Sequence, residues 1–411
     1  MRNTLIAIRL ALRNLRRQKR RTALTVSGLT MGLIVMIVAY AMLDGLTDQA
    51  LDSYIQYETA HLRGFPQGYL NDDTFRTLDK LFGSADSLRD ALADELDVQT
   101  TVRLHIPGQL IVGTEEAFIE IVGVDPERDR TVYATLDQLQ SGESLDHKGG
   151  VLIGRKLAKD MGLTVGDRPT LFARSAPGAL NSLRLPVIGI LNTGHPAVDG
   201  QSAYVSLTDA QQLALVNDSA NELAVLGGNR KNADKLREQL NMHGSTLEWQ
   251  TWEEAAAGFL YVMQFRRIAM SVVVAILALI AAVAVSNTMI MAVHERTQEI
   301  GALRALGFER SMIGRLFLFE GISIGLLAGV LALLFGSAIV LWLHNVGISL
   351  EAYEDVQSGI PINTSFYPSL HASNPIITLS FGLILTALAS WTAAYRAQRG
   401  EVVRALREGR L

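Results

Sequence analysis

The sequence predicts an integral membrane protein with four transmembrane α-helices and a large extracytoplasmic α+β domain inserted between the first helix and the second. Hydrophobic residues make up 49% of the 411 residues, charged residues only 19%, and the mean hydropathy is +0.21. Four stretches contain no charged residue and are long enough to cross a bilayer, namely 22–43, 268–293, 321–343 and 376–394. This composition argues against a purely cytosolic globular enzyme.

The basic residues predict how the spans are oriented. The chain before the first span carries eight basic residues and no acidic one: Arg2, Arg9, Arg13, Arg16, Arg17, Lys19, Arg20 and Arg21. Arginines also recur in 294–320 and after 394, whereas 344–375 has acidic residues and neither Lys nor Arg. Because short cytoplasmic segments are enriched in Lys and Arg, both termini are expected in the cytoplasm and 44–266 outside.

The residues before the first span have their own pattern. Leu5, Ile8, Leu12 and Leu15 recur at helical spacing with arginines between them, which predicts a basic amphipathic helix in the headgroup layer. A cleaved signal peptide is the alternative, because Ala39-Tyr40-Ala41 is similar to a cleavage site. The uncharged stretch is longer than the roughly 7–15 residues of a signal core, which favours a retained span.

The inserted segment 44–266 alternates between strand and helix patterns. Strands are expected at 110–112, 118–124, 151–153, 185–191 and 203–207, and helices at 84–96, 155–161, 208–216 and 232–240. Thr208 with Gln211 is expected to form a capping box, as is Thr251 with Glu254.

The inserted segment is expected to join the membrane through two long helices. No proline interrupts 252–293, which predicts one helix running from the domain through the second span. The segment 44–59 also lacks proline and continues the first span. These two stalks could act as levers or only as tethers.

The sequence offers little chemistry. The absence of cysteine excludes disulfides and iron–sulfur clusters, and the eight histidines are too dispersed for a local metal motif. The segment 149–156 has the glycine spacing of a phosphate-binding loop but Arg155 and Lys156 in place of its Lys and Ser/Thr. We therefore expect no catalytic residue, no metal site, no cofactor in this chain and no nucleic-acid partner.

Small residues recur where helices would pack. Gly28 and Gly32 form one GxxxG motif in the first span, and Gly321, Gly325 and Gly329 form a doubled one in the third. Such motifs allow helix backbones to approach closely. They serve either dimerisation or packing within one chain, and the sequence leaves both open.

Three segments carry a resemblance to a known family. The segments 12–25 and 294–308, the latter reading HERTQEIGALRALGF, resemble the signatures of FtsX-like permeases, the MacB and LolC/LolE type of ABC transporter subunit. The segment 154–167 is similar to a stretch of that family's periplasmic domain. The layout is nearest to the lipoprotein-releasing LolC/LolE permeases.

The resemblance implies a domain plan and partners. It gives 1–43 as the amphipathic helix with the first span, 44–266 as a MacB-like periplasmic domain with its stalk, and 267–411 as the FtsX-like part. A dimer of permease subunits, identical or related, would bind two copies of a separate ATPase, which binds ATP and Mg. A coupling helix at 294–310 would contact the ATPase through five residues: Glu295, Arg296, Glu299, Arg304 and Gly307.

The resemblance also implies a bacterial inner-membrane location and a mode of action. ATP hydrolysis would move the periplasmic domains through the stalks and extract a lipoprotein, lipid or hydrophobic substrate from the membrane. Candidate substrate contacts are Val35, Val38, Met42, Met263 and Met270, although methionines at helical spacing also serve as core residues. A periplasmic lipoprotein carrier or adaptor is a further possible partner, but 174–183 is shorter than the chaperone-binding loop of LolC. The alternatives are tripartite efflux and a signalling scaffold that transports nothing.

Overall fold

A computed structural model describes residues 13, 17, 19–70, 78–145, 149–242, 246–349 and 365–399. The chain divides into two compact units, which we describe separately. The helical unit comprises Met1–Thr47, Met263–Ile348 and Tyr367–Leu411, and the sheet unit comprises Asp48–Val262 and Ser349–Phe366. The leucines and isoleucine of the amphipathic helix predicted before the first span lie outside the described residues.

Among the described residues, five helices lie wholly or partly in the helical unit: α2 (Lys19–Tyr54), α10 (Ala257–Glu295), α11 (Thr297–Ala305), α12 (Arg310–Val346) and α13 (Ser373–Arg399). All except α11 are long and apolar enough to cross a membrane, which confirms the four predicted spans. α2 continues through Tyr54 into a π-helical turn, Ile55–Thr59, before the first strand.

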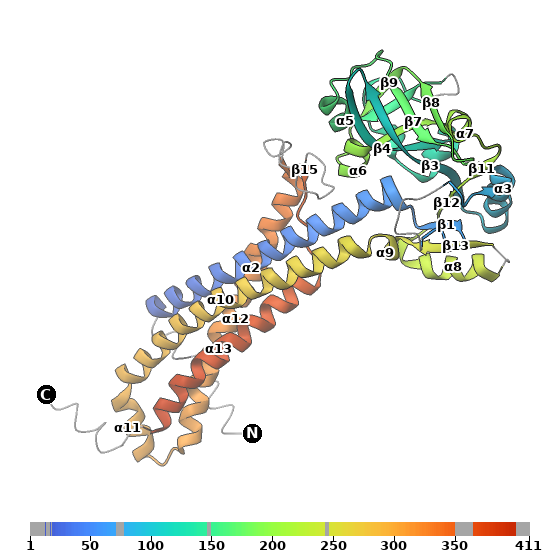
Figure 1. Cartoon of the computed structure of the whole chain (residues 1–411). Helices are drawn as coiled ribbons and strands as arrows, with labels where there is room; N and C mark the ends of the chain where they lie inside the picture. The colour runs from blue at the N-terminus through green and yellow to red at the C-terminus, as the bar shows by residue number, and fades with distance from the viewer. Residues whose placement is uncertain are drawn as a thin grey trace. The chain divides into compact units, whose positions relative to one another are not determined.

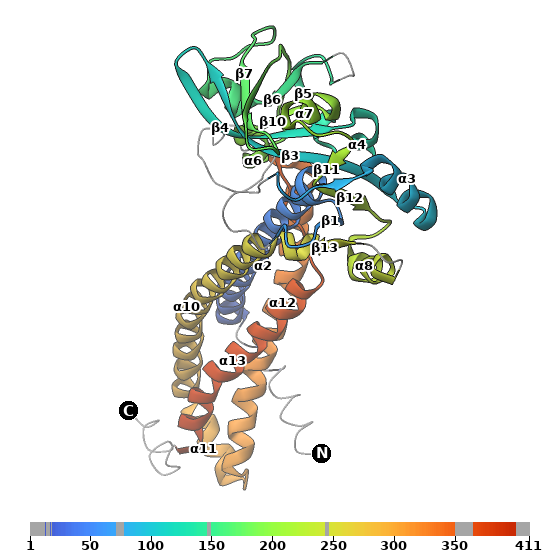
Figure 2. The ribbon, with the colours of Figure 1, turned by 45° about the vertical axis from the view of Figure 1, so that its right-hand side comes forward.

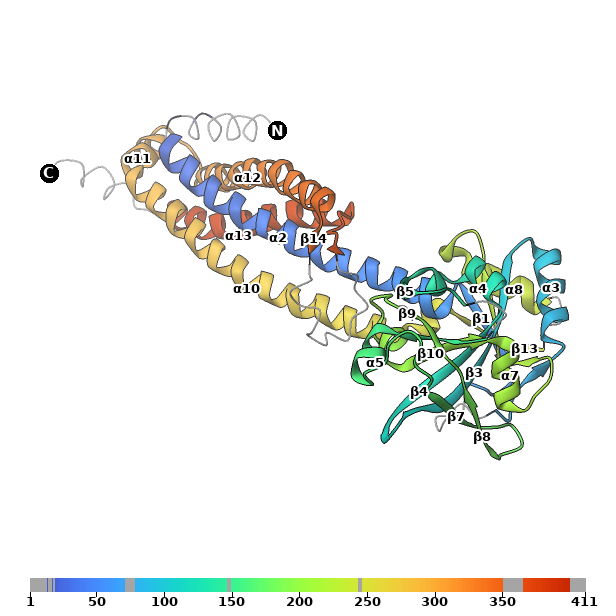
Figure 3. The ribbon, with the colours of Figure 1, turned by 90° about the horizontal axis from the view of Figure 1, so that it is seen from above.

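The core of the helical unit forms where α2, α12 and α13 meet. Ile37 of α2, Phe317 and Ala328 of α12 and Ala393 of α13 are all buried in one apolar cluster. α10 runs beside α2 in the unit (Figures 1 and 3), yet it buries less of its span than the other three helices. Four of its five buried side chains, Val285, Met289, Ala292 and Val293, lie in the half nearest α11. Met263 is the one buried side chain of the other half, which is otherwise mostly uncovered.

The sheet unit is built on one mixed sheet (Figure 2), whose main path runs β13-β1-β12-β3-β4-β10-β6-β9-β5. Off this path, β7 pairs with β3, and β8 pairs with β7. Its strands are β1 (Leu62–Pro66), β3 (Gln99–Val112), β4 (Glu115–Val124), β5 (Leu139–Gly142), β6 (Val151–Gly154), β7 (Thr170–Arg174), β8 (Leu180–Arg184), β9 (Val187–Leu191), β10 (Ser202–Ser206), β12 (Glu222–Leu226) and β13 (Leu247–Thr251). Two short pairs, β2 (Phe82–Gly83) with β11 (Ser219–Ala220) and β14 (Ile348–Ser349) with β15 (Ser365–Phe366), stand apart. Each of the five predicted strands overlaps a strand of the main sheet, although 185–191 begins two residues before β9 and 203–207 ends one residue after β10.

Short helices accompany the strands of this sheet. They are α3 (Ala85–Leu96), α4 (Pro126–Val132), α5 (Arg155–Asp160), α6 (Pro196–Gln201), α7 (Leu207–Ala214), α8 (Ala233–Met242) and α9 (Trp252–Ala255), with 3-10 turns at Thr135–Asp137 and Arg230–Asn232. Each of the four predicted helices has a counterpart among them. The glycine-rich segment 149–156 becomes strand β6 followed by α5, a helix of only 6 residues.

The capping box predicted for Thr251 and Glu254 is confirmed, but two other predictions about helices are wrong. Thr208 and Gln211 do not form a capping box. Ser206 caps α7 instead, accepting a hydrogen bond from the backbone N–H of Asp209, so α7 begins one residue before Thr208. The helix predicted to run unbroken from 252 is interrupted at Ala256, between α9 and α10.

Candidate coupling site

Helix α11 connects α10 to α12 and begins and ends at defined caps. Arg296 separates it from α10, and Gly307 follows its last turn with φ +91°, a conformation that favours glycine. The N–H of Phe308 donates to the carbonyl of Leu303 at 3.1 Å, and the N–H of Gly307 donates to that of Arg304 at 3.1 Å. This is the Schellman arrangement, so Gly307 has a structural role in ending α11.

A buried ion pair fixes the start of α11. Arg296 Nη1 lies 3.1 Å from Glu320 Oε2 of α12, and the two side chains are only 9% and 6% exposed. Removing one partner of such a pair leaves an uncompensated buried charge, which costs about 3–5 kcal/mol. Arg296 therefore points into the helical unit and links the α10–α11 corner to α12.

Two exposed ion pairs join the same corner to the start of α2. Arg21 Nη1 lies 3.1 Å from Glu295 Oε2, and Arg17 Nη1 lies 2.9 Å from Glu299 Oε1. Exposed pairs of this kind each contribute about 0–1 kcal/mol, so they orient α11 without locking it. Of the five predicted coupling residues, Arg304 lies in the last turn of α11. The structure thus brings all five onto α11 and its two ends.

The uncovered face of α11 was not singled out from the sequence. Gln298, Ala302 and Ala305 recur at helical spacing and are exposed, and Leu306 beyond them is 78% exposed. The i, i+4, i+7 spacing places these residues on one helix face, but the charged residues of the same segment mask this pattern in the sequence. The face offers one amide, two methyl groups and a leucine side chain on a helix that is held at both ends.

The predicted substrate contacts differ in how far they are exposed. Val35 and Met42 are exposed on α2, whereas Val38 packs against the core of the helical unit. Met263 is buried and Met270 is half-buried on α10. The hydroxyls of Tyr40 and Ser271, 3.3 Å apart, mark where α2 and α10 meet.

The two glycine motifs have different surroundings. A methyl group on Gly321 or Gly325 would collide with Ser390 or Thr386 of α13, and one on Gly329 would lie 2.6 Å from Leu379 Cδ1. The doubled motif of α12 therefore packs against α13 within the chain. Gly28 and Gly32 of α2 have no atom of another helix within 4 Å of the position of a Cβ, among the described residues.

A polar cluster that the sequence analysis missed lies around Asp44, at the end of the unit opposite Arg21. The Asp44 side chain is buried and accepts a hydrogen bond from Asn374 Nδ2 at 2.8 Å. Arg267 Nη1 lies 4.0 Å and His371 Nδ1 3.6 Å from its carboxylate oxygens. The cluster joins α2, α10 and the start of α13. Its signal in the sequence was the position of Asp44 and Arg267 at the borders of uncharged stretches.

Comparison with known proteins places both parts of the chain. A model of the MacB-like periplasmic core domain matches residues 22–242, and one of the FtsX-like permease C-terminal region matches residues 271–402. The lipoprotein-releasing system transmembrane protein LolC of Haemophilus influenzae is 21% identical over 393 residues, covering 94% of this chain and 93% of LolC. The ABC transporter permease YknZ of Bacillus subtilis is 25% identical over 359 residues, covering 79% and 84%.

A solved structure is also similar. The periplasmic region of MacB from Actinobacillus actinomycetemcomitans aligns with 51% of this chain and 97% of its own, at 14% identity and a TM-score of 0.36. The assignment depends on the two sequence models, which follow one another along the chain and together cover most of the four long helices and of the sheet unit. The chain therefore belongs to the family of FtsX-like, MacB-type ABC transporter permeases.

Proposed function

We propose that this permease converts ATP hydrolysis by a separate ATPase subunit into movement of its extracytoplasmic domain, and that this movement extracts a lipid-anchored substrate from the membrane. The permease itself would hold no nucleotide, and ATP with Mg would bind to two ATPase copies. A second permease subunit, identical or related, would complete the complex in a bacterial inner membrane, with both termini and α11 on the cytoplasmic side.

The observation that carries the coupling proposal is the way α11 is held. The buried Arg296–Glu320 pair fixes its first turn, and the Gly307 turn fixes its end. Its exposed face of Gln298, Ala302, Ala305 and Leu306 fits the common mode in which one helix lies in a groove of a partner protein. A displacement of α11 by the ATPase would pass to α12 through the buried pair and to α10 through the chain.

The substrate proposal depends on the relatives and on α2. LolC is named as part of a lipoprotein-releasing system, and the acyl chains of a lipoprotein are apolar. Val35 and Met42 present an apolar surface on α2 that such chains could contact, and methionine adapts to varied shapes. The uncovered half of α10 offers further apolar surface beside α2.

The test of coupling uses substitutions on the exposed face of α11. Leu306→Asp and Ala302→Asp place a charge in the proposed contact, and we expect permease-dependent stimulation of the ATPase to fall about tenfold, the effect of about 1.4 kcal/mol. Glu299→Ala and Arg304→Ala should lower the stimulation less. The measurement is ATP hydrolysis by the reconstituted complex at several permease concentrations.

Met242→Asp is the matched control, because Met242 is as exposed as Leu306, at 77%, and lies in the sheet unit. It should leave the stimulation unchanged. Unaltered stimulation in both α11 variants would remove this helix from the coupling role.

A further inference from the structure

The end of α2 inside the sheet unit has an unusual backbone. After Tyr54 the helix widens into the π turn Ile55–Thr59, and Ala60 follows with φ 49° and ψ −152°. The N–H of Ala60 donates to the carbonyl of Ile55 at 3.0 Å, and its side chain is fully buried. A residue with a Cβ is strained in this conformation, so the surrounding contacts must hold it there.

Those contacts include partners for the last carbonyls of the helix. The N–H of Ala134 donates to the carbonyl of Gln56 at 3.0 Å, and Thr135 Oγ1 donates to that of Tyr57 at 3.4 Å. Arg63 Nη1 donates to the carbonyl of Glu58 at 3.4 Å. The C-terminal carbonyls of a helix carry partial negative charge and usually lack partners within the helix. Here these carbonyls accept hydrogen bonds from the Arg63 guanidinium and from two donors of one short segment, Ala134 and Thr135.

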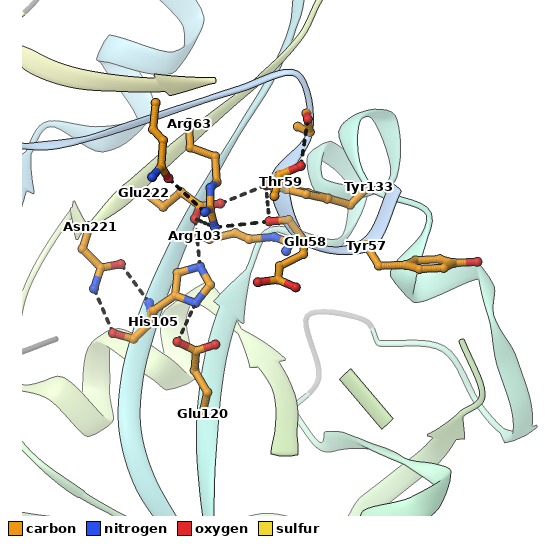
Figure 4. A network of polar contacts seen from close by, with 12 residues as sticks. Tyr57, Glu58, Thr59, Arg63, Arg103, His105, Glu120, Tyr133, Asn221 and Glu222 are labelled. Carbon is orange, nitrogen blue, oxygen red and sulfur yellow. Dashed lines mark hydrogen bonds and ion pairs between the residues drawn. The ribbon is translucent and has the colours of Figure 1, made fainter. Parts of the chain in front are cut away.

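A second layer of buried groups holds these partners in place (Figure 4). The Tyr133 hydroxyl donates to Glu222 Oε1 at 2.9 Å and lies 3.4 Å from the carbonyl of Glu58. Arg63 Nη1 lies 3.5 Å from Glu222 Oε2, and Glu222 is fully buried. Burial alone would raise the pKa of Glu222, but the charges of His105, Arg63 and Arg103 outweigh it and hold this pKa well below its usual range.

The ring of Tyr133 is fixed from its face. The guanidinium carbon of Arg103 lies 3.3 Å from the ring centroid, and Arg103 donates two hydrogen bonds to Asp129, at 2.7 and 2.9 Å. Both side chains of this pair are buried. The Arg103–Asp129 pair therefore holds the Tyr133 ring in one orientation, in which the hydroxyl points toward the end of α2.

We propose that Arg63, Tyr133 and Glu222 are positioning residues, which make the last turns of α2 and the sheet unit a single rigid body. This inference rests on the proposed function, because only a rigid junction would let movement of α2 turn the domain instead of bending the chain. Alanine at position 60 supports it. Glycine would relieve the strain there but would also admit other backbone conformations, as a flexible hinge requires.

The test measures rigidity directly. The chain has no cysteine, so Asp48→Cys on α2 and Thr208→Cys on α7 can carry spin labels without further substitutions. Both sites lie in the sheet unit. In the full-length complex we expect a narrow distribution of label-to-label distances, unchanged by ATP. Ala60→Gly, Tyr133→Phe and Glu222→Gln should each broaden it and cause loss of substrate release, while ATPase stimulation persists.

Thr131→Val serves as the control, because the Thr131 hydroxyl donates only to the carbonyl of Arg128 on α4, outside the junction. It should keep the distribution narrow. Tyr133→Phe retains the ring and its contact with Arg103, and an unchanged unfolding midpoint would show that this variant folds. A broad distribution in the parent chain, or equal widths in all variants, would overturn the inference. Absent ATPase stimulation in the parent chain would contradict the proposed function alone, because the distances are measured independently of it.

Discussion

His105 links the buried network of the sheet unit to pH. Its Nδ1 lies 3.3 Å from Glu120 Oε1 and its Nε2 lies 3.3 Å from Glu222 Oε2. Burial disfavours the charged ring, but the two carboxylates outweigh burial and raise the pKa of His105 to about 9. The ring is therefore protonated at neutral pH and is part of the charge balance around Glu222.

The raised pKa predicts how stability depends on pH. Because the pKa of His105 is about 9 when folded and about 6.5 when unfolded, its contribution is complete below pH 6.5 and is lost as the pH rises through 9. The expected loss is on the order of 3 kcal/mol, because one pKa unit corresponds to about 1.4 kcal/mol. Hydrogen exchange of β3 and β4 in the full-length chain, followed between pH 6 and about pH 9.5, measures it.

His105→Gln should flatten this dependence, and His294→Gln, at an exposed position in the helical unit, should not. An equally steep loss of protection in both variants would assign the pH dependence to other groups.

Single residues also show where sequence patterns stop being informative. The charges of 294–310 were predicted to act together, but the structure separates them, since Arg296 is buried against Glu320 and Glu299 lies on the surface. The partner of Arg296 follows 24 residues later, on another helix. Nothing local distinguishes an arginine that points inward from one that points outward, because that choice depends on how α12 packs.

At the scale of elements, α12 and α13 make the most extensive contact between helices of the described chain. Gly321 and Gly325 face Ser390 and Thr386 so tightly that no side chain fits between the helices. Dispersion and close backbone approach, not the hydrophobic effect, favour such contacts in a bilayer. The glycines of α12 therefore determine how near α13 can lie.

This packing predicts different outcomes for the two glycine motifs. Gly325→Leu should destabilise the chain by about 1–3 kcal/mol or more, because the larger side chain forces α12 and α13 apart. Gly28→Leu should leave the folded monomer intact, since its surroundings are open. Thermal unfolding of the two variants in detergent compares them.

Dimer content measured on the same samples tests the alternative that the glycine motifs serve dimerisation. If the Gly325→Leu variant no longer dimerised but kept the stability of the parent chain, the glycine motif of α12 would serve dimerisation and not packing within one chain.

The strands show which elements can be predicted from the sequence. β6, β9 and β10 are short apolar runs and were predicted within a few residues. Most of β3 was missed, because its buried half carries Thr101, Arg103 and His105. These polar residues are buried because partners on other elements satisfy them, so the strand does not show the apolar pattern of a core strand. The start of α7 was misplaced for a related reason, since Ser206 and Thr208 are both capable of capping a helix.

At the scale of the whole molecule, the sequence was most informative about class. Four uncharged stretches and the arginines between them predict the spans, because lipid excludes charge in any fold. The order of strands in the sheet was beyond prediction, since β4 pairs with β10 in parallel across a long separation. The Asp44 cluster likewise joins residues from three helices that are distant in the chain.

Mass spectrometry of the complex purified gently from native membranes tests whether this chain works with an ATPase on a lipid-anchored substrate. We expect an ABC ATPase subunit to co-purify with this chain, together with a bound lipoprotein or lipid. A periplasmic adaptor in place of the lipoprotein would redirect the substrate proposal to efflux, and an external enzyme would redirect it to signalling. Absence of any ATPase from the intact complex would contradict the proposed coupling.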